Sequence, residues 1–198
     1  MRVCAQTPFK GRRTLAPVTT PNPTQPDMTT TTTLSIDLKP VKIGLALAIL
    51  TILMGLLLGA LFGLNEDLFQ NYIQAGIAAH PQFFPDAAKE QEIIWRWVQR
   101  AHFHAGGIGA FSLALITLTA LTGMSYRRKQ ITAALIGLSI FYPLTWYALY
   151  VYAPLIGRTA AHSAFIPELF AEIGIGALCL GFLSLIHGLF LQSDASRD

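Results

Sequence analysis

Two histidines at alternate positions, His102 and His104, are the side chains best suited to chemistry in this chain. They lie in the string RAHFHAGGIGA, residues 100–110, in which only the first residue, Arg100, is charged. An imidazole can bind a metal ion or haem iron, or exchange a proton near neutral pH. Residues two apart on a helix point about 200° apart, so one ion cannot bind both rings. The two histidines therefore need different partners.

Carboxylates follow one apolar stretch and begin another. Glu66 and Asp67 close the first stretch, and Glu168 and Glu172, four residues apart and thus on one helix face, open the last. We expect these residues at the depth of the two histidines. They predict a metal site built from His102, His104, Glu66 and Glu172, as in bundles whose ligands project inward from facing helices. The alternative is a buried network of hydrogen bonds and ion pairs that only holds helices together.

Four apolar stretches must position these residues, at about 43–64, 101–126, 131–152 and 167–191. Each reaches the roughly 20 residues that a helix needs to cross a bilayer. We therefore predict an all-α, four-helix transmembrane bundle over residues 41–192, with an outer segment at 65–100. Residues 87–100 are expected to be helical and to continue without a break into the second span. Pro143 is expected to kink the third span.

Basic residues mark one side of the predicted bundle. Lys39 and Lys42 precede the first span, and residues 127–129 (RRK) connect the second to the third. By the positive-inside rule, both groups of basic residues face the cytoplasm, and so do both termini. The protein is expected to lie in the inner membrane of the cell. Anionic headgroups account for the net charge of +3, so we expect no nucleic-acid partner. The expected partners are the lipid bilayer and another membrane protein or a second copy of the chain.

Residues 1–40 are rich in proline and threonine and are predicted to be a disordered tail, whose true start could be Met28. The two cysteines, Cys4 in this tail and Cys179 in the fourth span, lie too far apart to predict a disulfide.

Glycines at four-residue spacing predict where the first span packs. Gly55, Gly59 and Gly63 lie on one face and let a neighbouring helix approach closely. His102 is expected to point inward, because it shares a face with Gly106 and Gly109. His187, near the cytoplasmic end of the last span, is expected to lie far from the outer residues.

The string Ala101–His104 (AHFH) resembles the AHFH string in subunit I of haem-copper oxidases. In that family the two histidines face opposite ways and are axial ligands of two haems near the outer side of the membrane. The resemblance covers four residues. It implies at most one metal ion or b-type haem here, bound by His102 or His104 with a second ligand such as His162. The chain departs from the family at residues 165–170 (FIPELF), which have no histidine before Pro167.

These observations favour one function and leave a second open. The chain is expected to bind copper, iron, zinc or haem b at the outer face, as a redox or assembly component of a membrane complex. The alternative is a structural or accessory membrane subunit without a cofactor. The chain has no GxSxG, HExxH or P-loop motif, so an enzymatic role would be that of a metal-dependent membrane oxidoreductase.

Overall fold

The structure, a computed structural model, describes residues 36–191, which belong to one compact unit and form helices but no strand. The α-helices are α1 (Lys42–Asn65), α2 (Asp67–Ala79), α3 (Ala87–Leu121), α4 (Tyr126–Gly137), α5 (Phe141–Ile156), α6 (Arg158–His162) and α7 (Phe165–Phe190). Three short 3₁₀ helices, η1 (Lys39–Val41), η2 (Pro81–Phe83) and η3 (Leu138–Ile140), complete the described elements. The predicted all-α fold is confirmed.

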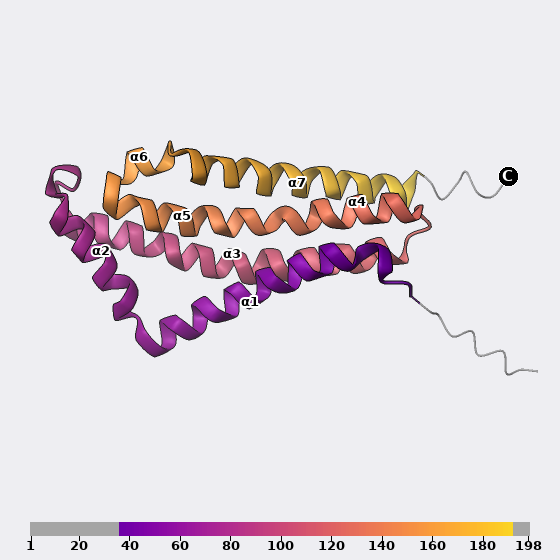
Figure 1. The fold of residues 1–198 in the computed structure, drawn as a ribbon, viewed down its shortest axis with the longest axis horizontal. Coiled ribbons are helices and arrows are strands. Elements are labelled where there is room, and N and C mark those ends of the chain that lie inside the picture. Colours follow the sequence, from indigo (N-terminus) through magenta and orange to yellow (C-terminus); the bar gives the residue numbers. More distant parts are fainter. Residues whose placement is uncertain (1–35, 192–198) are drawn as a thin grey trace, which may run out of the picture. The chain divides into compact units, whose positions relative to one another are not determined.

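Four helical segments are long and apolar enough to cross a membrane, at Lys39–Asn65, Ala87–Leu121, Tyr126–Ile156 and Phe165–Phe190. The third combines α4, η3 and α5. Figure 1 shows α7, the α4–α5 segment, α3 and α1 next to one another in this order. The four-helix transmembrane bundle is therefore confirmed, and the chain is a multi-pass membrane protein.

The α4–α5 segment is the centre of the bundle. It packs against α1, α3 and α7, whereas α3 and α7 touch each other only slightly. Buried apolar side chains form two clusters, one toward the end where α2 lies and one toward the end of the α3–α4 turn. Phe69, Ile94, Trp97 and Tyr150 belong to the first, and Ile116, Ile136 and Leu185 to the second.

Close backbone approach holds α1 against α3. A Cβ atom added to Gly55 would lie 2.9 Å from the backbone nitrogen of Gly106, and one added to Gly59 would lie 2.7 Å from the His102 ring. A Cβ atom added to Gly63 would meet nothing within 4 Å. The predicted packing face is thus confirmed at Gly55 and Gly59, and it ends before Gly63.

Helix α2 was not predicted within the outer segment 65–100. It begins directly after α1 and folds back over the ends of α3 and α5 (Figure 1). Its buried residues, Phe69, Ile73 and Ile77, are four apart and so form one apolar face. A Cβ atom added to Gly76 would lie 2.3 Å from the Cβ atom of Pro154, which shows how closely α2 approaches α5.

Two spans, the second and the third, have boundaries that differ from the prediction. The second span ends at Leu121, not at residue 126, because Thr122 takes an extended conformation (ψ 161°) and starts the turn into α4. It also begins at Ala87, as the predicted continuity with residues 87–100 requires. The third span extends to Ile156 and contains η3 just before Pro143.

Residues 1–35, with Met28 and Cys4, lie outside the described residues. Pro40 is already buried, so the predicted tail 1–40 extends slightly too far.

Candidate functional site

His102 lies between α3 and α1. Its Nδ1 atom is 2.8 Å from the carbonyl oxygen of Gly55, and its ring lies beside Gly59, with the Phe62 ring edge-on at 5.6 Å. A neutral imidazole that donates from Nδ1 to a carbonyl keeps its lone pair on Nε2. The predicted inward orientation of His102 is confirmed, and its ring packs against the glycine face of α1 at Gly55 and Gly59.

His104 faces the opposite side of α3. Its ring stacks on Trp146 at 5.9 Å and meets Tyr142 edge-on at 4.9 Å, both in α5. The guanidinium of Arg100, one turn earlier on α3, lies 4.8 Å from the centre of the Trp146 ring. Such a cation–π contact contributes about 0.5–1 kcal/mol at an exposed position. The two histidines therefore stabilise two different helix pairs, as their separation around the helix predicts.

His162 ends the short helix α6 and packs against the core residue Trp97, with ring centres 4.9 Å apart. Partial burial, followed by the positive charge of Arg158, lowers the pKa of His162 below its usual range. The charged form of the ring is therefore disfavoured. His162, His102 and His104 thus contact three different sets of residues.

The carboxylates proposed as ligands are exposed. Glu66, between α1 and α2, accepts a 3.3 Å hydrogen bond from the Gln70 side chain. Glu172 lies on the outer face of α7, where it lines a shallow hollow with Glu168. Within residues 36–191, no three His, Cys, Asp or Glu side chains lie together as a metal ion would require. The structure does not bring His102, His104, Glu66 and Glu172 together.

Glu90, which the sequence did not single out, makes the best-formed ion pair of the outer end. The Nε and Nη2 atoms of Arg158 donate to its two carboxylate oxygens at 3.0 and 3.3 Å. This pair connects α6 to the first turn of α3. The only sequence signal was an acidic residue at a helix start, where an acid is favourable without any partner. The partner Arg158 lies 68 residues further along the chain.

Other polar side chains also link helices. The Tyr72 hydroxyl of α2 donates to the Val151 carbonyl of α5 at 2.7 Å. At the other end of the bundle, Arg128 donates to Nδ1 of His187 at 2.8 Å. His187 therefore lies beside the α3–α4 turn, as predicted, far along α7 from Glu172. Hydroxyl pairs lie between these two ends: Ser112 with Ser139, and Thr132 with Ser184.

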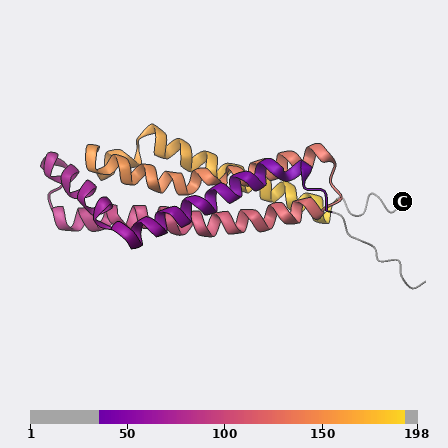
Figure 2. The same ribbon diagram turned by 60° about the horizontal axis from the view of Figure 1, so that its bottom comes forward.

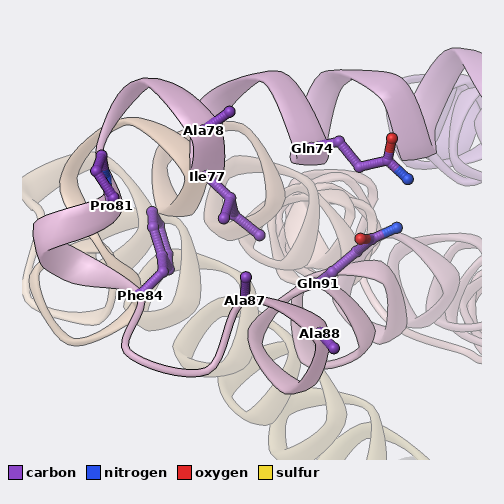
Figure 3. A pocket seen from close by; sticks show the side chains of 8 residues that line it. All are labelled: Gln74, Ile77, Ala78, Pro81, Phe84, Ala87, Ala88 and Gln91. Carbon is purple, nitrogen blue, oxygen red and sulfur yellow. The ribbon is translucent and has the colours of Figure 1, made fainter.

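An open hollow of about 450 Å³ lies between α2 and the start of α3 (Figure 3). Ile77 and Phe84 provide apolar walls, and the side chains of Gln74 and Gln91 extend side by side at one end (Figure 3). The remaining lining residues are Ala78, Pro81, Ala87 and Ala88. None of these side chains titrates, so the hollow offers apolar surface and two amides but no acid–base chemistry.

The fold and the polar contacts define a multi-pass α-helical membrane protein in which His102 and His104 lie at helix–helix interfaces. The chain matches no protein-family model, no curated protein and no solved structure.

Proposed function

We propose that the chain is a structural subunit of a membrane complex, in which His102, His104 and the ion pair of Arg158 with Glu90 hold together the transmembrane helices and the outer cap, which is formed by α2 and α6. The contact between His102 Nδ1 and the Gly55 carbonyl, at 2.8 Å, is the observation that carries this proposal. It uses the most unusual side chain of the chain to join α1 to α3. A polar bond between membrane helices contributes about 0.6 kcal/mol on average and up to about 2 kcal/mol.

The other outer polar residues support the same role. Arg158 and Glu90 connect α6 to α3, and Tyr72 connects α2 to α5. His104 packs between the aromatic rings of Tyr142 and Trp146. Each of these groups lies against a different neighbouring helix. The ligands of a cofactor would instead have to point toward one shared centre.

In the proposed orientation, the protein lies in the inner membrane of the cell and both of its termini face the cytoplasm. Lys39 and Lys42 lie at the same end of the bundle as the three basic residues in the first turn of α4, as Figure 1 shows for the starts of α1 and α4. This grouping supports a cytoplasmic location for that end, since short cytoplasmic loops carry an excess of lysine and arginine.

Purified protein tests the proposal directly. Elemental analysis and an absorption spectrum of the detergent-solubilised chain should show neither stoichiometric copper, iron or zinc nor a haem band. His102→Ala should lower the free energy of unfolding by about 1–3 kcal/mol, because both the hydrogen bond to the Gly55 carbonyl and the packing of the ring against Gly59 and Phe62 are lost. A haem spectrum or stoichiometric metal that disappears in His102→Ala would contradict a purely structural role.

A second candidate function is a metal or b-type haem centre with His102 as one ligand. The same hydrogen bond favours it, because a ligating histidine commonly donates its other ring N–H to a carbonyl. Gly59, without a side chain, leaves the place that the His102 ring itself occupies. Bound haem iron would supply electron-transfer chemistry, while His102 would hold the iron and the Gly55 carbonyl would fix the orientation of the ring.

This second candidate predicts a different result for His187. His187→Ala should retain the haem or metal, because His187 lies beside Arg128 at the opposite end of the bundle from His102. His102→Ala should lose it. Retention in both variants would remove His102 as a ligand.

A further inference from the structure

Four side chains with polar groups form one cluster on α3 and α5. Arg100 and His104 lie one turn apart on α3, and Tyr142 and Trp146 lie one turn apart on α5. The Arg100 guanidinium is 4.8 Å from the centre of the Trp146 ring, and the His104 ring contacts both aromatic rings. Figures 1 and 2 show α3 and α5 side by side from two directions. These four residues are called the α3–α5 cluster.

The polar groups of the α3–α5 cluster contact rings and not hydrogen-bonding partners. Within residues 36–191 the ion pairs are Arg96 with Glu92 and Arg158 with Glu90, so Arg100 belongs to neither. The indole nitrogen of Trp146 is buried and has no acceptor among these residues. Arg100 is exposed and the other three side chains are partly exposed. A molecule from the surroundings can therefore reach the guanidinium, the imidazole and the phenol.

The α3–α5 cluster lies at the edge of the hydrocarbon layer. Arg100 is the last charged residue before the charge-free stretch of α3. About 20 residues counted back from Leu121, where α3 ends, reach Ala101. Arg100 thus lies at the level of the lipid headgroups, and Tyr142 and Trp146 are residue types that are enriched at this level. A cation at such a depth needs an opposite charge nearby.

The protein supplies no such charge to Arg100. Residues 93–121 of α3 and the whole of α5 contain no aspartate or glutamate. Glu172 of α7 is turned about 200° from Gly174, the residue by which α7 packs on Tyr142, so it faces away from α5. Lys89 also lacks an ion pair, but it lies about 16 Å further out on α3, where water surrounds it. Arg100 is therefore the cation of this end whose counterion has to come from the membrane.

We propose that the α3–α5 cluster binds the phosphate of an anionic phospholipid, in the leaflet on the side of α2. The planar guanidinium of Arg100 fits two phosphate oxygens, and its contact with Trp146 holds it in place. His104 and Tyr142, one turn deeper, offer an N–H and an O–H to the ester oxygens of the same lipid. Basic sites between membrane helices recognise headgroups in this way.

Below the α3–α5 cluster, α3 offers a surface for the acyl chain of that lipid. Gly107, two turns below Arg100 on the same face, would accept a Cβ atom with nothing within 4 Å. One turn deeper, the rings of Phe111 and of Phe182 in α7 contact each other with centres 6.4 Å apart, and both are exposed. The distance along α3 from Arg100 to Phe111 is about 16 Å, close to the thickness of one leaflet's hydrocarbon layer, about 15 Å.

The charge of the α3–α5 cluster selects an anionic lipid over a zwitterionic one. The cationic group of a zwitterionic headgroup would find no carboxylate on α5 or on residues 93–121. Phosphatidylglycerol has a net negative charge that compensates Arg100. A free phosphate ion has the same oxygens but has no acyl chain to cover Gly107 and Phe111. The inference goes beyond the proposed structural function and does not depend on the role of His102.

Fluorescence of Trp146 provides a test that reports on this site alone. The chain has three tryptophans, so Trp95→Phe and Trp97→Phe leave Trp146 as the single emitter. In vesicles of phosphatidylglycerol and phosphatidylcholine, one lipid carries bromine near the glycerol end of its acyl chains, and quenching measures its occupancy beside Trp146. Phosphatidylglycerol should bind there about tenfold more strongly, the ratio that one charge-assisted hydrogen bond gives. Arg100→Gln should abolish this preference.

Two matched variants are the controls. Lys89→Gln removes an outer cation on the same helix, and Arg127→Gln removes one at the opposite end of the bundle. Both should keep the preference at Trp146. Equal binding of the two lipids before any charge is removed would overturn the proposal, and so would a preference that survives Arg100→Gln. Inorganic phosphate in excess should not change the quenching. If it abolishes the preference, the occupant is an aqueous anion and not a lipid.

Thermal unfolding of the chain with its native tryptophans gives an independent measurement. In a neutral detergent, added phosphatidylglycerol should raise the unfolding temperature of the unmodified chain more than that of Arg100→Gln, because a ligand stabilises the folded state that binds it. Added phosphatidylcholine should affect the two chains equally. The same stabilisation of both chains by phosphatidylglycerol would contradict a site at Arg100, even if the tryptophan replacements disturb the fold.

Discussion

Gly59 and Gly63 have different surroundings although both lie on the same face of α1. A side chain at Gly59 meets the His102 ring, whereas one at Gly63 meets open space. Gly59→Leu should therefore lower the free energy of unfolding by about 1–3 kcal/mol, the usual cost of over-packing. Gly63→Leu is the matched control and should change it by less than about 0.5 kcal/mol. Thermal unfolding in detergent measures both changes. Equal losses of stability would show that the two positions are packed alike.

At the scale of single residues, the sequence predicts the direction in which a side chain points better than it predicts the residues that the side chain contacts. The inward orientation of His102 follows from its angular position beside Gly109. Its hydrogen-bond acceptor does not, because a backbone carbonyl has no sequence signature. The same limit applies to Glu172 and Glu66: hydropathy gives depth within a span, but depth does not determine which helices are neighbours. Residues at one level of the bundle are therefore not necessarily in contact.

One ion pair, Arg158 with Glu90, connects α6 to α3 in addition to the packing of His162 on Trp97. The Glu90 side chain is 13% exposed and that of Arg158 is 41% exposed. A double-mutant cycle with Arg158→Ala and Glu90→Ala should give a coupling energy of about 0.5–1 kcal/mol, which allows for screening at the partly exposed guanidinium. Chemical unfolding in detergent provides the measurement.

The pair of Arg96 with Glu92 is the matched control for this cycle. Both side chains are more than half exposed and lie one turn apart on α3. Their coupling energy should be about 0.2–0.5 kcal/mol. If the coupling of Arg158 with Glu90 is no larger, that pair does not hold the outer cap.

At the scale of elements, the spans and the long helix from Ala87 were predictable because charge-free runs and amphipathic spacing are strong signals. Helix α2 was missed although Phe69, Ile73 and Ile77 repeat every four residues. The cluster of Asn65, Glu66 and Asp67 was interpreted as the point where the first helix leaves the membrane, with a solvated helix end as the simplest explanation. In the structure Glu66 keeps helical dihedral angles (φ −61°, ψ −33°), so polarity ended the span but not the helical conformation.

Accessibility tests the orientation of the whole molecule. In a chain with Cys4→Ser and Cys179→Ser, single cysteines at Gln82 and Thr159 should react with an impermeant thiol reagent applied to intact cells. A cysteine at Arg127, in the first turn of α4, should react only after the membrane is opened. The reverse pattern would place the cap formed by α2 and α6 in the cytoplasm, contrary to the distribution of lysine and arginine.

Helix α3 is a single rod of 35 residues, about 50 Å long, although a bilayer needs only about 20 residues of it. It packs against α1, α2, α4 and α5, and its first residues also meet α6 through Arg158 with Glu90 and His162 with Trp97. Because no break separates these first residues from the span, the cap cannot tilt without tilting the span. A displacement of the cap formed by α2 and α6 would therefore tilt or rotate the membrane-spanning part of α3 against its neighbouring helices.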